Sequence, residues 1–291
     1  MRVAVIGAGA IGAVVASASA EAGHDVVVCV RTPFKSLEII REDVALVVRA
    51  QIATVAPGPY ADVVFVAVKA IDVASTAPHL AVLCGPETLT VAILNGLDQA
   101  ERVAPHVPAH AGPVAPAIAY IASELISPGR VKHISGHLLV VPEIYAEVVG
   151  AALGAAMNVR AANDMVTASW EKLLGNLVAN PITALTLRHM DVMRSPGIPE
   201  LGRNILVEAC AVGRAEGAKL QDNQVDLVLE RLGKFGPETG NSMLYDRLAG
   251  RPTEHQFLTG EVVRRATEHG IAVPVNEALL ALLEAQQPGA D

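Results

Sequence analysis

One segment in the second half of the chain carries polar side chains at helical spacing. In SWEKLLGNLVANPITAL, the residues Lys172, Asn176 and Asn180 fall four apart, so one face of one helix would present an ammonium group and two amides. A buried polar stripe is costly unless something hydrogen-bonds to it, and a polar substrate would do so. The alternative is a solvated helix face on which Asn180 lies near the helix end, before Pro181. The spacing alone does not decide between the two.

The N-terminal stretch MRVAVIGAGAIGAVVASASA also has two interpretations. Arg2, the apolar run and ASASA fit a secretory signal peptide, which would be removed. The same residues fit a strand from Val3 to Ile6 that turns into a helix through Gly7-Ala8-Gly9-Ala10-Ile11-Gly12. The second interpretation would place a binding site here.

The residues that follow favour the binding site. A dinucleotide motif needs a strand before it, a helix after it and a second strand about 20 residues on. The helix is expected over residues 10–22, and HDVVVCVR supplies the second strand. Gly7 would make the tight turn, Gly9 would leave room for a pyrophosphate, and Gly12 would let helix and strand pack closely. We therefore predict a dinucleotide site at the N-terminus.

The residues that end the second strand indicate which dinucleotide binds. An NAD site needs an acid there to accept hydrogen bonds from the ribose 2′-hydroxyl, and that acid would repel a 2′-phosphate. This chain has Arg31 and Thr32, which can both donate hydrogen bonds to phosphate oxygens. The alternative is that Arg31 is an ordinary solvated residue after a strand. We expect NADP(H).

Polar residues follow two further expected strands. Asp62 to Val68 runs into Lys69, and Leu89 to Leu94 runs into Asn95-Gly96. The carboxyl ends of neighbouring parallel strands converge on a bound cofactor, so Lys69 and Asn95 are candidate site residues. Taken alone, the lysine would be a snorkelling surface residue and Asn-Gly an ordinary turn.

The order of the apolar runs predicts the fold class. Four runs that are apolar on both faces are typical of strands covered by helices on both sides: Val3 to Ile6, Asp25 to Val30, Asp62 to Val68 and Leu89 to Leu94. His133 to Val141 alternates more and contains a glycine, which predicts a hairpin at the sheet edge that ends the first domain. Long helical periods replace the strands from Asn163 onward. We predict an α/β Rossmann-type domain over residues 1–162 and an all-α domain over residues 163–291.

The composition excludes several classes of partner. The chain has 291 residues, 52% of them hydrophobic, which is enough for two domains, and its net charge of −8 offers no field for nucleic acid. The mean hydropathy is +0.40, yet no charge-free apolar run of about 18 residues predicts a membrane span.

The cysteines and histidines predict neither disulfides nor a metal site. Cys29, Cys84 and Cys210 are far apart in apolar contexts, which favours reduced core thiols in a cytoplasmic protein. His106 and His110 are four residues apart, but the neighbouring prolines deny them the helix that would bring them together.

Several motifs resemble those of the ketopantoate reductase (2-dehydropantoate 2-reductase) family, in the same order over nearly the whole chain. They are GAGAIG, Arg31 after the second strand, VKA, LNGLDQAERV, W-x-K-x-x-x-N-x-x-x-N-P and NSMLYDRLAGRPTE. The motifs in the helical half are much more specific than the glycine motif. The resemblance implies a Rossmann domain joined to a helical domain like the C-terminal domain of 6-phosphogluconate dehydrogenase. It also implies NADPH-dependent reduction of a 2-keto acid in the cleft between them.

The resemblance assigns roles to individual residues. Lys172 is similar to the family's catalytic proton donor, and Asn176 and Asn180 to its substrate-binding amides. Ser242 is similar to the carboxylate-binding serine, and Glu254 to the acid that completes the cleft. Lys172 and Glu254 are the expected catalytic residues.

The same resemblance completes the cofactor site. Asn95 is similar to the family's asparagine near the nicotinamide and the substrate, so it counts as both a cofactor-binding and a substrate-binding residue. Ala122 joins Lys69 and the glycine loop among the expected cofactor contacts.

The residues around Glu254 also support a purely structural interpretation. Thr253 and Gln256 form a plausible capping box for a helix that begins after Pro252. Glu254 would then be a first-turn acid that complements the helix dipole.

The chain departs from the family pattern at two places. Arg188-His189-Met190-Asp191 stands where the family tends to have an Asn-Gly pair after the lysine helix. After Thr253-Glu254, Gln256 and Thr259-Gly260 replace an aspartate and a later asparagine. These departures spare the expected catalytic core but alter the substrate pocket, so the resemblance does not decide which 2-keto acid is reduced.

Two classes of function remain. The first is NADPH-dependent reduction of a small 2-keto acid, with 2-dehydropantoate (ketopantoate) to pantoate in pantothenate biosynthesis ahead of any other single reaction. The second is a catalytically idle, redox-sensing NADP-binding module. The retention of Lys172 together with Asn95, Ser242 and Glu254 favours the enzyme. We expect a small 2-keto acid partner and a cytoplasmic location, with a homodimer as one option for assembly.

Overall fold

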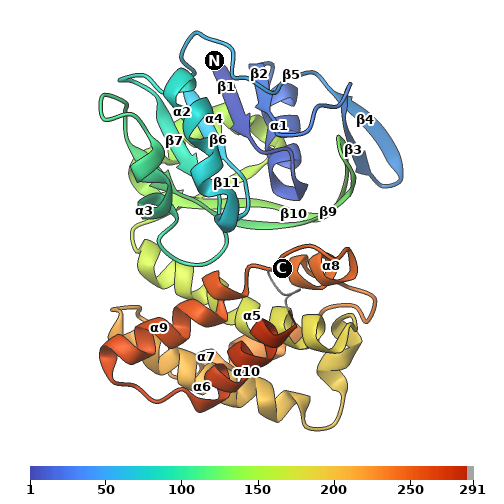
Figure 1. The fold of residues 1–291 in the computed structure, drawn as a ribbon, viewed down its shortest axis with the longest axis vertical. Helices are drawn as coiled ribbons and strands as arrows, with labels where there is room; N and C mark the ends of the chain where they lie inside the picture. Colours follow the sequence, from blue (N-terminus) through green and yellow to red (C-terminus); the bar gives the residue numbers. More distant parts are fainter. Residues whose placement is uncertain (287–291) are drawn as a thin grey trace. The chain divides into compact units, whose positions relative to one another are not determined.

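Figure 1 shows the computed structural model, which describes residues 1–286. Residues 287–291, the end of the expected second domain, lie outside the described residues. The chain divides into two compact units. The first contains Met1–Leu94 and Asp98–Met165, and the second contains Asn95–Leu97 and the chain from Val166 onward.

The first unit contains a six-stranded sheet in which every neighbouring pair is parallel. Its strands, in the order β5-β2-β1-β6-β7-β8, are β1 (Arg2–Ile6), β2 (Asp25–Cys29), β5 (Gln51–Ala53), β6 (Val63–Val66), β7 (Leu89–Ala92) and β8 (Val114–Pro116). The four apolar runs are the four central strands. Alternate residues of β1 enter two separate cores, with Val3 and Val5 in one and Ala4 and Ile6 in the other. Both faces of the sheet are buried, which confirms the doubly wound arrangement.

Helices supply the side chains that cover the two faces. The helices of this unit are α1 (Ala10–Glu21), α2 (Ala77–Leu83), α3 (Gln99–Val103) and α4 (Glu143–Leu153), with 3₁₀ turns at Ala70–Thr76, Ala104–His106 and Gly154–Ala156. Helix α1 contributes Val14 and Val15 to one core, whereas α2 contributes Leu80 and Leu83 to the other.

A second sheet in the same unit was not predicted. It has the order β11-β10-β3-β4, with β9 also paired to β10, and its strands are β3 (Leu37–Arg41), β4 (Val44–Val48), β9 (Ile118–Ser127), β10 (Arg130–Pro142) and β11 (Asn158–Ala162). The hairpin expected at His133 to Val141 exists as β9–β10, but its placement at the edge of the first sheet was wrong. Strand β10 lies inside the second sheet and buries Val131, Leu139 and Val141 in the core that also holds α1. The alternation therefore reflects a strand with one buried face.

The second unit is helical throughout residues 166–286. Its helices are α5 (Met165–Thr186), α6 (Ile198–Ala215), α7 (Gln224–Gly233), α8 (Ser242–Leu248), α9 (Thr259–His269) and α10 (Pro274–Ala285), with 3₁₀ turns at Met190–Arg194 and His255–Phe257. Helix α5 supplies several large, fully buried side chains, among them Trp170, Leu173, Leu174 and Leu177. Within residues 1–286, no helix combines the length and the apolar character that crossing a bilayer requires.

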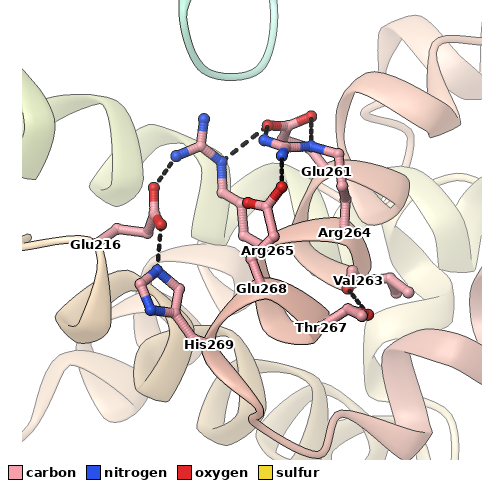
Figure 2. A network of polar contacts seen from close by, with 8 residues as sticks. All are labelled: Glu216, Glu261, Val263, Arg264, Arg265, Thr267, Glu268 and His269. Carbon is pink, nitrogen blue, oxygen red and sulfur yellow. Dashed lines mark hydrogen bonds and ion pairs between the residues drawn. The ribbon is translucent and has the colours of Figure 1, made fainter.

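A network of ion pairs fixes α9 to the end of α6 (Figure 2). The Arg265 Nε donates to Glu261 Oε1 on the same helix at 2.8 Å, and its Nη1 pairs with Glu216, which ends α6. Glu216 also bonds His269, and Glu261 pairs with Arg264. Because Arg265 and Glu261 are both buried, this network holds the start of α9, and with it the turn that precedes α9, in one position.

Candidate active site

The glycine loop between β1 and α1 has a different steric requirement at each glycine. Gly7 has a φ of +98°, and a Cβ atom there would lie 2.7 Å from the Ala67 carbonyl oxygen. A Cβ at Gly12 would lie 1.9 Å from the Gly7 carbonyl oxygen, so the helix packs directly on the turn. A Cβ at Gly9 would meet nothing within 4 Å. The loop is thus closed at Gly7 and Gly12 and open at Gly9, where a pyrophosphate needs room.

The open side of the loop adjoins the start of α1 and strand β9. Gly9 is the N-cap of α1, and no side chain caps the helix there, so its first N–H groups suit an anion. Ser123 on β9 donates to the Ala10 carbonyl oxygen at 2.9 Å. Ala122, the exposed residue before it, therefore lies close to the loop. These residues fit a dinucleotide.

Arg31 and Thr32 follow β2 as predicted, and both are exposed. The Arg31 Nη1 lies 3.2 Å from Asp72 Oδ1, in the 3₁₀ turn that follows β6. Sequence reasoning missed Asp72, because no local pattern links it to Arg31. An exposed ion pair of this kind is weak, so the Arg31 guanidinium can still bind a phosphate group.

Lys69 lies at the start of the same 3₁₀ turn. It is partly buried, and its carbonyl oxygen accepts a hydrogen bond from the Asp72 N–H at 2.9 Å. Strands β2, β1 and β6 are neighbours in one parallel sheet, so Arg31, Asp72 and Lys69 all lie at its carboxyl edge. The structure brings these three charged groups to the edge at which ligands of such sheets bind.

The helix predicted to carry Lys172, Asn176 and Asn180 is α5, and it continues through Pro181 to Thr186. Asn180 is only 3% exposed, so the solvated-face alternative, with a helix end at Pro181, was wrong. No hydrogen bond to the Asn180 side chain is present among residues 1–286. Its amide atoms are not among the fully buried polar atoms that lack a partner, so they keep some contact with solvent, and a bound ligand could take the place of that solvent.

Lys172 is partly buried on the same helix. Its burial and, second, the nearby positive charge of Arg231 lower the pKa of Lys172 to about 8. The Arg231 Nη2 donates to the Glu171 carbonyl oxygen at 3.5 Å and would lie 2.8 Å from a Cβ at Gly175. A larger residue at position 175 would displace the guanidinium. Sequence reasoning missed Arg231, because it reaches α5 from α7 through tertiary packing alone.

Ser242, the first residue of α8, is exposed and is positioned by its neighbour. Asn241 caps α8 by accepting a hydrogen bond from the Leu244 N–H at 3.1 Å. The Asn241 Nδ2 also donates to the Ala179 carbonyl oxygen at 3.2 Å and to Thr183 Oγ1 at 2.7 Å. These bonds hold the start of α8 against the segment of α5 that contains Asn180.

Asn95 and Glu254 meet within the second unit. The Asn95 Nδ2 donates to Glu254 Oε2 at 3.0 Å, and Glu254 is buried. Gly96 has a φ of +86°, and a Cβ there would lie 2.3 Å from the Phe257 carbonyl oxygen. The backbone of Asn95-Gly96 therefore packs closely against the turn that follows Glu254, so this pair is more than an isolated turn.

The predicted capping box after Pro252 was wrong. Thr253 Oγ1 bonds His255 Nδ1 at 2.8 Å, and the Gln256 side chain donates to Glu284 at 2.6 Å, so neither caps a helix. A 3₁₀ turn intervenes and α9 begins only at Thr259. Glu254 is thus not a first-turn acid of α9.

The residues that depart from the family pattern bond to other parts of their own unit. Arg188 pairs with Asp191 and donates to Ser195 Oγ at 3.1 Å, which closes the Arg188-His189-Met190-Asp191 loop on itself. The hydrogen bonds of Arg188 hold the pKa of Asp191 below its usual value.

The residues that sequence reasoning set aside as structural also have defined places. Cys29, Cys84 and Cys210 are buried and unpaired, and burial raises the pKa of each thiol. The His110 ring contacts the Tyr60 ring at 6.4 Å between centroids. Within residues 1–286, no group of three or more histidine, cysteine or acidic side chains is placed to hold a metal ion.

A parallel Rossmann sheet with an open glycine loop, followed by a helical unit with a lysine and amide face, defines a nicotinamide-dependent oxidoreductase. The family description "Ketopantoate reductase PanE/ApbA" matches residues 3–144, and "Ketopantoate reductase PanE/ApbA C terminal" matches residues 164–287. The chain belongs to the ketopantoate reductase family.

Relatives and solved structures agree with this assignment over the full length. A protein of Mycobacterium tuberculosis named 2-dehydropantoate 2-reductase is 36% identical, with 99% of this chain and 98% of the relative covered. A protein of the same name from Caulobacter vibrioides is 37% identical, with 97% and 98% covered. A structure of a dimeric ketopantoate reductase from Staphylococcus aureus aligns with a TM-score of 0.87 at 26% identity, with 99% of each chain covered.

Proposed function

We propose that this protein uses NADPH to reduce a small 2-keto acid to the 2-hydroxy acid, with ketopantoate to pantoate as the first candidate reaction. In this proposal residues 1–162 form the NADP-binding domain and residues 163–291 the substrate domain. The names of the full-length relatives support the reaction. The three buried, unpaired thiols support a cytoplasmic location.

The observation that carries the proposal is the polar face of α5. It combines Lys172, whose pKa is lowered to about 8, with Asn176 and the largely buried Asn180. A lysine that titrates near neutral pH is a more effective proton donor than an ordinary lysine, because its acidity is closer to the working pH. Two uncharged amides can orient a polar substrate beside it without adding a competing charge.

The cofactor preference rests on the first unit. The open loop at Gly9 and the start of α1 would receive the pyrophosphate, and Arg31 with Thr32 would receive the 2′-phosphate. Lys69 and Ala122 lie near the same edge. When bound, the cofactor supplies the hydride that reduces the ketone carbon.

The residues of the second unit would handle the charge that this reduction creates. A ketone that gains a hydride becomes an alkoxide, and Lys172 can both stabilise the negative charge and deliver the proton. Ser242 is available for the substrate carboxylate, and Asn176 and Asn180 for the oxygens near the ketone. Asn95 and Glu254, which bond each other, would complete the set.

A panel of 2-keto acids tests the reaction directly. The rate of NADPH consumption should be compared, as kcat/KM, for ketopantoate, 2-ketoisovalerate, phenylpyruvate and benzoylformate. A lead for ketopantoate of about a hundredfold, or roughly 2.7 kcal/mol, supports the proposed substrate. A lead for another acid identifies a divergent reductase, and silence across the panel supports the idle NADP-binding module.

The divergent reductase is the second candidate because of one loop. Arg188 closes on Asp191 and Ser195 where the family tends to have an asparagine. A site that loses one hydrogen bond to the distal hydroxyl of ketopantoate forfeits about 0.5–1.5 kcal/mol, which corresponds to about tenfold at most.

A further inference from the structure

Strand β4 is the last strand of the second sheet, and one of its edges has no partner strand among the described residues (Figure 1). It pairs with β3 on the other side, in the register Arg41↔Val44 through Leu37↔Val48. Its apolar side chains are unusually accessible, since Val44 is 58%, Leu46 45% and Val47 70% exposed. A free, apolar strand edge is a template for pairing with another chain.

The terminal strands β8, β11 and β5 are protected in ways that β4 is not. Strand β8 ends in Pro116, β11 contains Arg160, and β5 is a three-residue strand that begins with Gln51. Proline, charge and short length are the usual protections of an edge. The five residues of β4, VALVV, include none of these.

The β3–β4 turn determines which backbone groups of β4 face outward. Glu42 and Asp43 have φ values of 48° and 62°, so they form a two-residue hairpin turn closed by the hydrogen-bonded pair Arg41↔Val44. Hydrogen-bonded pairs alternate along an antiparallel ladder, so Val44 and alternate residues after it bond to β3. The N–H and C=O groups of Ala45 and Val47 therefore point to the free edge.

From this alternation of backbone groups we infer that β4 pairs antiparallel with β4 of a second copy of this chain, about a two-fold axis at Leu46. Two copies can pair only if outward-facing residues lie opposite outward-facing residues, which places the axis on a residue and not between two. With the axis at Leu46, Ala45 lies opposite Val47 of the partner subunit, and both exchange hydrogen bonds.

The two-fold axis could also lie at Ala45 or Val47, and the charges that flank β4 favour Leu46 over both. An axis at Leu46 brings Asp43 opposite Arg49 of the partner subunit twice, once at each end of the apolar stretch. An axis at Ala45 would instead oppose Arg41 and Arg49, which repel each other. An axis at Val47 would leave both Asp43 and Arg49 opposite uncharged residues. Opposite charges facing each other across strands favour the first register.

Both charged groups are available for the new pairing. Asp43 is exposed, and its Oδ1 lies 3.5 Å from Lys132 Nζ in a solvent-accessible ion pair. Arg49 is exposed and forms no ion pair within the described residues. The pairing would also cover Val44 and Val47, which are otherwise open to water.

A cysteine on the proposed axis tests the register. In a non-hydrogen-bonded antiparallel pair the two Cα atoms lie about 4.5 Å apart, which a disulfide can span. Leu46→Cys should therefore form a covalent dimer under mild oxidation. Val44→Cys is the matched control, because Val44 would face Val48 of the partner subunit and not its own copy. The native cysteines are buried and should not compete. Equal cross-linking of both variants would overturn the proposed register.

Sedimentation velocity of the whole protein tests the interface itself. Wild type should show a concentration-dependent dimer that Val47→Lys abolishes, while Ile144→Lys on α4, at an equally exposed position, leaves it intact. Asp43→Arg and Arg49→Asp should each raise the dimer Kd by about tenfold, and the double variant should restore it. A monomer at every concentration, or a dimer unaffected by Val47→Lys and by both charge reversals, would overturn the proposal. None of these measurements depends on the enzymatic activity.

Discussion

The Asn95 amide donates a hydrogen bond to the Glu254 carboxylate at 3.0 Å, and so connects the segment after β7 to the turn before α9. The two residues are far apart in the sequence, yet both belong to the second unit. Because Glu254 is buried, the amide is one of the groups that compensate its charge.

Asn95→Ala should therefore destabilise the protein by about 1–3 kcal/mol, because a buried carboxylate loses one of its donors. Urea unfolding followed by circular dichroism measures this change. In the Asn95→Ala background, Glu254→Gln should recover part of the loss, since a neutral side chain needs less compensation. If Asn95→Ala unfolds at the same urea concentration as wild type, the bond has no energetic role.

Lys172→Ala should lower kcat by about 10²–10⁴ and leave NADPH binding nearly unchanged. The reason is that the alkoxide would lose both its proton donor and its countercharge. Steady-state kinetics and a fluorescence titration of NADPH measure the two effects. Lys234→Ala is the control and should behave as wild type, because Lys234 is exposed and pairs with Glu230 four residues earlier. A Lys172→Ala variant with normal kcat would restore the structural interpretation of the helix face.

The rate of reduction should fall as the pH rises through about 8. Lys172 donates a proton only in its charged form, and its pKa is lowered to about 8, so the active form predominates below that pH and is lost above it. Arg231→Gln removes the second cause of the lowered pKa. The alkaline limb of the kcat profile should then move to higher pH, while Arg231→Lys keeps the wild-type profile. An alkaline limb that stays in place in Arg231→Gln would show that burial alone sets this pKa.

Arg31→Ala should weaken NADPH binding by about tenfold or more and leave NADH binding unchanged, because one charge-assisted pairing is lost. Asp72→Asn should have the opposite effect on NADPH, since the carboxylate that pairs with Arg31 would no longer repel a phosphate. Titration of both cofactors against protein fluorescence measures each affinity. Equal affinity of wild type for NADH and NADPH would contradict the cofactor assignment.

Asn241→Ala should raise the KM for the keto acid by up to about tenfold and cost about 1 kcal/mol of stability. It removes the cap of α8 and both bonds to α5, so the start of α8, with Ser242, would lose its fixed position against α5. Asn241→Asp keeps an acceptor for the cap but cannot donate to Ala179. If Asn241→Asp matches wild type in KM, the cap alone positions Ser242.

The central strands and the lysine helix could be predicted because their signals are local. The run from Val3 to Ile6 is apolar on both faces, and a strand buried on both sides shows this over any four residues. The spacing of Lys172 and Asn180 likewise belongs to one helix. Strand β4 was not predicted, because a hairpin is recognised only from both strands and the turn together, and VALVV alone does not show its partner β3.

The parts of the site that sequence reasoning missed depend on contacts between distant segments. Asp72 and Arg231 each lie beside a residue that was singled out, but only the fold brings them there. The capping role predicted for Thr253 was wrong, although a threonine three residues before a glutamine has the pattern of a capping box. In the structure its hydroxyl bonds His255 instead.

The helical unit is discontinuous in the chain, because residues 95–97 belong to it while the chain on either side belongs to the first unit. Leu97 is buried in the helical core, so that core cannot be completed from the second half alone. During synthesis, residues 95–97 leave the ribosome long before residues 166 onward, against which they pack. A fragment that begins at residue 163 should therefore fold incompletely, and a peptide spanning residues 89–103, added in trans, should complement it.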